Sequence, residues 1–184
     1  MAILKIARMG HPVLRVPADP VDNPGASEIK RLIADMIDTM HDAQGIGLAA
    51  PQVHVAKRVV IFHVPHDRVE NDSDDGLPCD PQPLTVLINP EVEPLSDELT
   101  VDWEACLSVP GMMGMVPRFA HIRYRGIATD GTATERIAEG FHARVVQHEC
   151  DHLDGLLYPL RMSDFSQFGF VDELKRVAVD SSDP

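Results

Sequence analysis

The alternation of apolar and polar positions along the chain predicts three helices. In residues 27–44 apolar side chains recur with a helical period, and Ser27 stands where an N-cap is expected. Residues 141–153 have the same period, and Gly155 follows them as a candidate C′ residue. A last amphipathic helix is expected to begin near Ser163. Its apolar positions are Phe168, Val171, Leu174 and Val177.

The segments between these helices have the pattern of strands. Residues 57–64 and 84–90 are short apolar runs that contain strand-favouring valine and isoleucine. Residues 126–137 are expected to form a hairpin, because Asp130-Gly131 favours a two-residue primed turn. Strands dominate the middle of the chain without a regular β–α–β alternation. We therefore expect an α+β fold, with mostly antiparallel sheets packed around the second helix.

Length and composition narrow the classes of protein to consider. The chain has 184 residues, 44% of them hydrophobic and 24% charged, which fits a single globular domain over residues 1–184. The formal net charge of −13 argues against a nucleic-acid partner and against binding to an anionic membrane. Much of the acid lies near residues 66–83, where we expect a surface loop.

The sequence gives no sign of export or membrane insertion. No apolar run reaches the length of a membrane span, and the first residues lack the layout of a secretion signal. We therefore expect a cytoplasmic protein. Its three cysteines have no disulfide-framework spacing, so free thiols are expected, and a free thiol can bind a metal.

The pattern His148-Glu149-x-x-His152 carries the first candidate chemistry. On a helix the two histidines lie one turn apart on one face, so both imidazoles can reach one metal ion. Glu149 is adjacent and can accept a proton from a water at the metal. Asp151 and Asp154 could orient the imidazoles from outside. A pair of surface histidines remains the alternative.

The third ligand decides the class of metal site. Glu173, in the predicted last helix, would complete a zinc endopeptidase of the two-histidine type. A cysteine would give a thiolate site instead. Cys150 lies about 200° around the helix from His148, which indicates a core residue, and Cys79 falls in the acidic loop.

Cys106 is the remaining thiol. It follows a strand-like stretch and precedes Val109-Pro110, which we expect to end strand pairing. One thiolate and two histidines make three protein ligands and leave a fourth position for water, as in catalytic zinc sites. A buried structural thiol remains the alternative reading of Cys106.

A glycine-rich segment, GIGLAAPQ at residues 45–52, could complete a site that attacks a carbonyl group. Its glycines allow the backbone to approach a ligand closely. The amide of Gln52 and a backbone N–H are suitable donors to an oxyanion. A tight packing turn remains the alternative.

Three segments, in this order along the chain, resemble the motifs of the peptide deformylase family: GIGLAAPQ, EACLSVPG and QHECDHLDG. The opening stretch ILKIARMGHPVLRVPADPV is also similar, so the likeness runs from Ile3 to about Met162. The family removes the formyl group from the N-terminal methionine of newly made proteins. The resemblance implies N-formylmethionyl nascent peptides as substrates and allows a transient ribosome contact. It implies Fe2+ as the ion, with Zn2+, Ni2+ or Co2+ also accommodated.

The resemblance also implies a role for each matching residue. Glu149 corresponds to the catalytic glutamate, and the amide of Gln52 and the backbone N–H of Leu107 to the donors that bind the reacting carbonyl. The metal ligands would be Cys106, His148 and His152. The substrate would be bound by Ile46, Gly47 and Val145, with Gly47 beside the peptide and the other two lining the methionine pocket.

The sequence departs from the family pattern at several positions. Ala105 replaces a usual glycine, and Met113 stands where many bacterial members have an arginine. Arg118 is either a substitute for that arginine or a surface charge at a strand edge. Arg144 is unexpected in an apolar pocket wall, so we expect it to pair with a carboxylate.

Two functions other than deformylation stay open at this stage. The first is the zinc endopeptidase, with Glu173 as third ligand, which leaves Cys106 and Gln52 without a role. The second is a non-catalytic metal-binding module with a closed site. A fourth protein ligand would reveal such a module, and Glu149 would then be dispensable.

Overall fold

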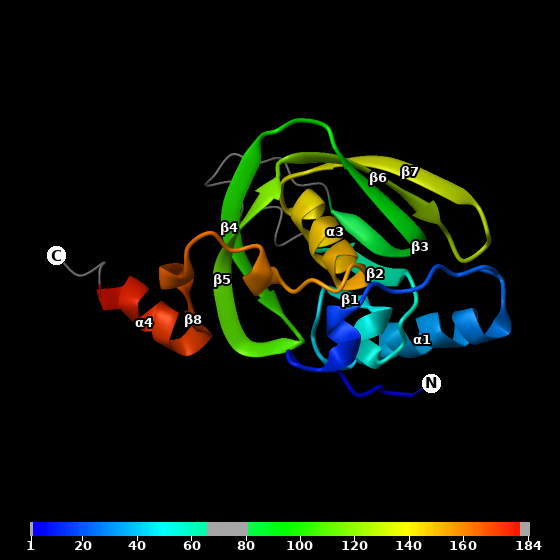
Figure 1. The fold of residues 1–184 in the computed structure, drawn as a ribbon, viewed down its shortest axis with the longest axis horizontal. Helices are drawn as coiled ribbons and strands as arrows, with labels where there is room; N and C mark the ends of the chain where they lie inside the picture. Colours follow the sequence, from blue (N-terminus) through cyan, green and yellow to red (C-terminus); the bar gives the residue numbers. More distant parts are fainter. Residues whose placement is uncertain (1, 66–80, 181–184) are drawn as a thin grey trace.

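The fold places one buried helix between two antiparallel sheets. The computed structural model describes residues 2–65 and 81–180, with side chains up to residue 176. Within these ranges Figure 1 shows helix α3 (Gly140–Leu153) at the centre, the larger sheet on one side and the smaller on the other. This arrangement confirms the expected α+β fold with antiparallel sheets around a central helix.

The larger sheet has the strand order β1-β2-β3-β6-β7, and the smaller has the order β4-β5-β8. The strands are β1 (Gly47–Ala49), β2 (Val59–Val64), β3 (Gln82–Pro94), β4 (Leu99–Cys106), β5 (Val109–Phe119), β6 (His121–Ile127), β7 (Ala133–Glu139) and β8 (Phe168–Phe170). The other helices are α1 (Ser27–Asp42) and α4 (Val171–Asp180). Single 3-10 turns are η1 (Pro12–Arg15), η2 (Ala50–Val53), η4 (Tyr158–Leu160) and η5 (Phe165–Gln167).

Strand β2 is buried on both faces, which explains its uninterrupted apolar sequence. Val60 and Phe62 pack into the cluster that contains α3, whereas Val59 and Ile61 pack against α1 on the other side. Successive side chains of a strand point to opposite faces, so one run of apolar residues serves two helices. The larger sheet is thereby fixed between α1 and α3.

Helix α3 is buried around most of its circumference. Its residues Val145, Val146 and Leu153 lie in the hydrophobic core of the molecule, as expected, and Cys150 packs in the same cluster. The Gln147 amide exchanges two hydrogen bonds of 2.9 and 3.0 Å with the backbone of Phe119, at the end of β5. These contacts dock the helix on both sheets, so its polar side chains are held in a largely water-free environment.

The start of α1 and the end of α3 can be compared with the sequence pattern. Helix α1 begins at Ser27, but Ala26 is the N-cap and no side chain caps the helix, so the prediction of Ser27 as N-cap is wrong by one residue. Gly155 follows α3 with a φ of 74°, as expected for a C′ residue. A β-carbon there would lie 2.7 Å from the backbone carbon of Arg15, so close packing also requires glycine.

Two local predictions are corrected by the structure. Strands β6 and β7 form the expected hairpin, but residues 128–132 make a longer loop in place of a two-residue turn. The Asp130 carboxylate accepts hydrogen bonds from the Thr132 N–H and hydroxyl, which closes this loop. The last helix begins at Val171, later than Ser163, because residues 168–170 pair with β5 as strand β8.

The acidic stretch and the expected absence of a membrane span can be compared with the described residues. Residues 66–80 of the acidic stretch, with Cys79, lie outside the described residues. No helix in the described ranges combines the length and the apolar character needed to cross a bilayer.

Candidate metal centre and active site

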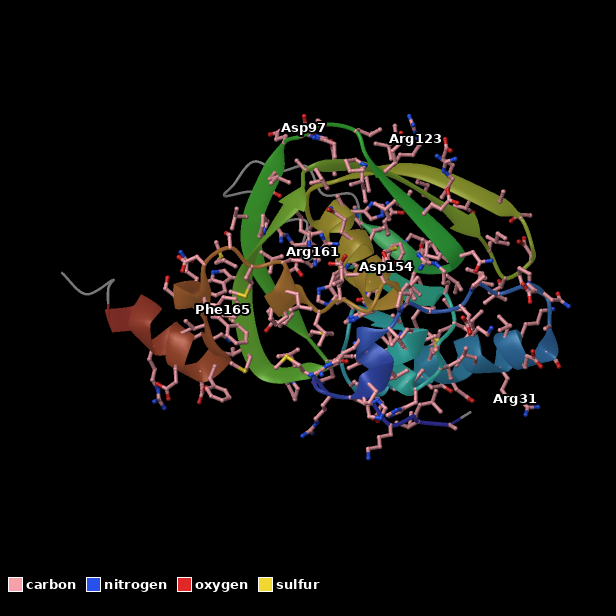
Figure 2. The ribbon with its side chains drawn as sticks, in the orientation of Figure 1. Arg31, Asp97, Arg123, Asp154, Arg161 and Phe165 are labelled. Atoms are coloured by element: carbon pink, nitrogen blue, oxygen red, sulfur yellow. The ribbon has the colours of Figure 1, made fainter. Side chains whose placement is uncertain are left out.

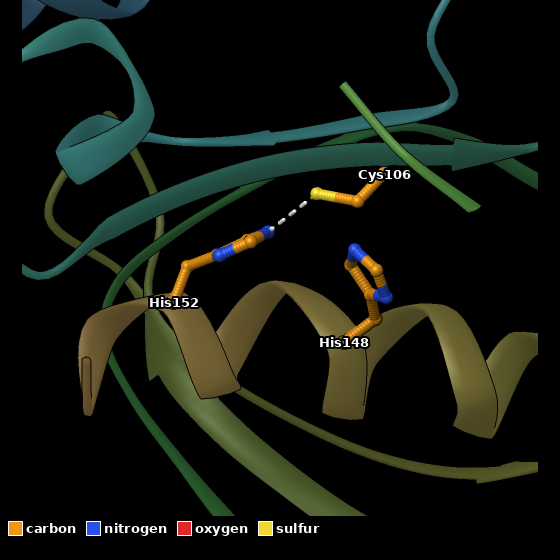
Figure 3. A group of neighbouring side chains, drawn as sticks. All are labelled: Cys106, His148 and His152. Carbon is orange, nitrogen blue, oxygen red and sulfur yellow. Dashed lines mark hydrogen bonds between the residues drawn. The ribbon is translucent and has the colours of Figure 1, made fainter. Parts of the chain in front are cut away.

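Cys106, His148 and His152 come together at the middle of the molecule. Helix α3 places the two imidazoles one turn apart, with ring centroids 5.1 Å from each other. Cys106 ends β4 at a tight turn where it pairs with Val109 of β5, and its Sγ lies 3.4 Å from His152 Nε2 (Figure 3). The potential ligand atoms of the three residues all lie within 4.8 Å of one another.

The donor set fits a borderline divalent metal. One thiolate and two imidazoles suit zinc and other late first-row ions, including iron. Among the described residues the group has three members, so a fourth coordination position is left for a small ligand. The expectation that Val109-Pro110 ends strand pairing is wrong: these residues begin β5, and the turn before them directs the thiol of Cys106 toward α3.

Glu104 is a functional residue that the sequence interpretation missed. Its Oε2 lies 2.8 Å from His148 Nδ1, and the carboxylate is buried. An ionised carboxylate can only accept, so Nδ1–H is the donor and the other ring nitrogen, Nε2, is left for a metal. The sequence did contain a signal: Glu104 is two residues before Cys106 in one strand, so both side chains point to the same face.

Glu104 is also the centre of a buried ion-pair network. Arg118 binds both of its oxygens at 2.8 and 2.9 Å, and Arg144 binds Oε1 at 2.9 Å. Burial opposes ionisation of Glu104, but hydrogen bonds from Arg118 and His148 outweigh it and hold its pKa well below its ordinary value. Arg144 therefore pairs with a carboxylate, as expected. Arg118 is 4% exposed, so the interpretation as a surface charge is wrong, and it does not line the cleft described below.

Asp151, in α3, and Asp154, at its C-cap, do not orient the histidines. Asp151 pairs with Arg118 and accepts two hydrogen bonds from Arg161, at 2.7 and 3.1 Å. Asp154 forms a partly exposed pair with Arg58 at 2.8 Å. Figure 2 labels Asp154 and Arg161 near one end of α3. The imidazole-orienting role predicted for these aspartates is therefore wrong, and Glu104 makes that contact with His148.

Glu149 differs from Glu104 in having few partners. Its carboxylate is buried, and Oε2 has no hydrogen-bond partner among the described residues. Burial raises the pKa of Glu149 to about 7, although the neighbouring His148 partly opposes this. A β-carbon on Gly47 would lie 2.6 Å from Glu149 Cδ, so the glycine is what leaves room for this carboxylate. A group of this kind can accept and return a proton near neutral pH.

The two histidines differ in protonation while no metal is bound. Burial opposes charge on His148, but hydrogen bonds with Cys106 and Glu104 prevail and raise its pKa well above the ordinary value. Burial and the charge of His148 lower the pKa of His152 well below that value. A ligating imidazole must give up its metal-facing proton, so metal binding would release the proton that His148 holds there.

Gln52 points its amide group at the metal ligands. Its Oε1 accepts the Ala49 N–H at 2.8 Å, which turns the NH2 group toward β4. Nε2 then lies 3.1 Å from Ser108 Oγ and 3.6 Å from Cys106 Sγ. Fixed and buried in this way, the amide can donate a hydrogen bond to a small polar group bound beside the thiol.

A cleft of about 550 Å3 opens onto this group. It is lined by residues 44–47, 52, 103–107 and 109–113, and by Phe141, Arg144, Val145, His148, Glu149 and Val171. Eight of the nine predicted site residues line it, and the ninth, His152, belongs to the ligand group without lining the cleft. Ala105 and Met113 are paired across β4 and β5 and also border the cleft.

The residues proposed for the rival functions lie elsewhere. Glu173 is 61% exposed on α4 and pairs with Arg176 at 2.9 Å. It is not a member of the ligand group found among the described residues. Cys150, on α3 itself, is buried in the core as expected, and burial raises the pKa of its thiol far above the ordinary value.

The sequence matches the family model described as polypeptide deformylase over residues 3–168. A peptide deformylase of Ralstonia nicotianae is 53% identical over 173 residues, which covers 94% of each chain. The crystal structure of the peptide deformylase of Ehrlichia chaffeensis is similar with a TM-score of 0.80 and 32% identity, over 98% of this chain and 97% of that one.

A second solved structure was determined with a peptide. It is the Met-Ala-Ser-bound class I type b peptide deformylase of Acinetobacter baumannii, which is 34% identical with a TM-score of 0.78. The match covers 88% of this chain and 99% of that one. The matched residues 3–168 include all three members of the Cys106–His148–His152 group. The chain belongs to the polypeptide deformylase family.

Proposed function

We propose that the chain is a metal-dependent hydrolase that removes the formyl group from the N-terminal methionine of newly synthesised polypeptides. The observation that carries this proposal is the buried Glu149 carboxylate, whose Oε2 has no hydrogen-bond partner among the described residues and which borders the same cleft as Cys106 and His148. A ligand group of three with an adjacent base has the composition of a hydrolytic site. Formate and a free amino terminus would be the products.

Cys106, His148 and His152 would hold the metal. When bound, the cation supplies a water of lowered pKa and an electrophilic partner for the formyl oxygen. Fe2+ is the ion that we propose, and the same ligands accept Zn2+, Ni2+ and Co2+. Glu104 fixes the tautomer of His148, so that the imidazole presents one defined nitrogen to the ion.

The chain's own groups would carry the proton and the developing charge. Glu149 accepts the proton of the attacking water and returns it to the amine as the C–N bond breaks. The Gln52 amide and the Leu107 N–H donate hydrogen bonds to the former formyl oxygen as it becomes negative. Gly47 lets the peptide backbone approach, and Ile46 and Val145 contact the methionine side chain in the cleft.

The substrates would be N-formylmethionyl nascent chains in the cytoplasm, met through transient contact with the ribosome, and residues 1–184 would act as one catalytic domain. The rival functions have less support. The endopeptidase needs Glu173 as a ligand, but that residue is exposed and paired with Arg176. The closed module needs a fourth protein ligand, and the described residues offer three.

Formate release from formyl-Met-Ala-Ser, measured under anaerobic conditions with metal analysis of the same sample, tests the proposal. We expect turnover that is proportional to bound metal and is lost on chelation. The Glu149→Gln variant serves as control, since it should keep the metal and lose turnover. Metal-loaded protein that releases no formate, or cleavage of internal peptide bonds in its place, would contradict the proposal.

A further inference from the structure

We propose that Arg144 closes the inner end of the cleft and limits the length of the first side chain that a substrate can carry. This inference rests on the proposed function and adds a specificity-determining residue to it. Arg144 is 4% exposed and lines the cleft beside Val145 and His148.

Arg144 lies on the face of α3 that lines the cleft, one helical turn before His148. The helix residues that line the cleft are Phe141, Arg144, Val145, His148 and Glu149, which share one face of α3. Arg144 precedes His148 by four residues, or about 6 Å along the helix axis. A side chain that enters beside the metal ligands and runs along α3 therefore meets Arg144 at about the reach of a methionine.

The guanidinium forms a bridge from the helix to two strands. Nη1 donates to Glu104 Oε1 at 2.9 Å and to the Val116 carbonyl at 2.8 Å. Nη2 donates to the Thr100 carbonyl at 3.0 Å. Thr100 and Val116 do not line the cleft, whereas Arg144 does. The arginine side chain is therefore the boundary between the cleft and the interior of the β4–β5 hairpin.

The bridge makes this end of the cleft resistant to displacement. A longer substrate side chain would have to separate the guanidinium from buried acceptors, and each buried acceptor left without a donor costs about 1–3 kcal/mol. Because Glu104 compensates the charge of Arg144, the pocket end offers no free charge to a lysine or glutamate side chain. Unbranched, uncharged side chains of methionine length are the class that fits.

If Arg144 only stabilised the contact between α3 and the β4–β5 hairpin, the ratio of kcat/KM between short and long side chains would not change in its variants. Arg144 joins the helix that carries the histidines to the strand that carries Cys106, so its loss should lower stability and metal affinity in either case. Only the boundary role predicts a change in the ratio of kcat/KM between short and long side chains. That ratio is independent of how much of the protein is folded or metal-loaded.

The experiment compares two substrates, formyl-norleucyl-Ala-Ser and formyl-2-aminooctanoyl-Ala-Ser, whose first side chains are linear and differ in length. For the wild type we expect kcat/KM to fall by about 30-fold or more from the shorter to the longer, in line with the discrimination that tight pockets achieve. In Arg144→Leu the fall should shrink to about threefold or less. Arg144→Lys, which keeps a cation near Glu104 but cannot bridge both strands, should lie between.

Arg161→Leu is the matched control, because Arg161 belongs to the same charged network through Asp151 but does not line the cleft. It should keep the wild-type ratio. A wild-type enzyme that does not discriminate, or an Arg144→Leu variant with the wild-type ratio, would overturn the inference even if formyl-Met-Ala-Ser is a good substrate. Absence of formate release from formyl-Met-Ala-Ser would instead count against the proposed function.

Discussion

Two polar regions are buried along α3, and they differ in how completely their groups are paired. Around Glu104, each carboxylate oxygen accepts two hydrogen bonds, from Arg118, Arg144 and His148. Around Glu149 and His152, by contrast, Oε2 and Nδ1 have no partner among the described residues. The paired region holds elements in place, and the unpaired region is where an external group can be bound.

The largest effect is expected from removing the Glu149 carboxylate. Glu149→Gln should lower kcat for formyl-Met-Ala-Ser by about a thousandfold, because general acid–base catalysis contributes on this scale. Metal content should stay at the wild-type level, since Glu149 lies outside the ligand group. Formate release and metal analysis on one preparation check both points, and parallel loss of metal and activity would assign Glu149 to the ligand shell.

Substitutions in the paired region around Glu104 should mainly lower the free energy of unfolding. Glu104→Gln leaves the buried Arg144 without its carboxylate partner and Arg118 with Asp151 alone, so it should lower the free energy of unfolding by about 3–5 kcal/mol. It should also weaken metal binding by about 10–100-fold, because the His148 orientation is lost. Urea unfolding and chelator competition measure the two effects. Asp154→Asn is the matched control: its pair with Arg58 is partly exposed, so a comparable loss there would contradict the contrast.

In the metal-free protein, burial of the Glu149 carboxylate should make the free energy of unfolding depend on pH. The pKa of Glu149 is raised from 4.5 to about 7 in the folded chain, so the unfolded chain loses this proton first as the pH rises. The free energy of unfolding of the metal-free protein therefore falls as the pH rises from 4.5 to about 7, and the total loss above pH 7 is up to about 3 kcal/mol. Metal-free Glu149→Gln should lack this penalty and be more stable than metal-free wild type at pH 8. Urea unfolding with chelator at pH 5 and 8 checks this, and a pH-independent difference would refute it.

The smallest effect is expected at the exposed ion pair on α4. Glu173→Ala should change the free energy of unfolding by less than about 1 kcal/mol, as is usual for surface pairs. It should leave metal content and kcat unchanged, since Glu173 is not in the ligand group. Loss of metal in this variant would revive the endopeptidase interpretation.

The unpaired region was largely predictable from the sequence, and the paired region was not. His148 and Glu149 are recognisable because helical spacing and residue type restrict what they can do, and Cys106 because its segment resembles a family motif. Glu104 is bound by Arg144, 40 residues away in sequence, a contact that depends on how α3 docks on β4. Residue types alone do not specify such docking. Arg118 and Asp151 were misread for the same reason.

Local corrections have a similar physical cause. The segment before α4 has helical apolar spacing, yet residues 168–170 pair with β5, because a partner strand is available there. The Asp130-Gly131 hairpin has a longer loop because the Asp130 carboxylate bonds to Thr132. In both places a tertiary or side-chain contact outweighs the backbone preference read from the sequence.

The split origin of the metal ligands gives the cation a mechanical consequence. The thiol belongs to the β4–β5 hairpin and the imidazoles to α3. A bound ion would therefore crosslink two elements that are otherwise joined by the buried hydrogen bonds of Arg144, Gln147 and Asp151. The affinity for the ion and the free energy of docking the small sheet are then thermodynamically linked. Chelation should loosen the hairpin before the large sheet melts.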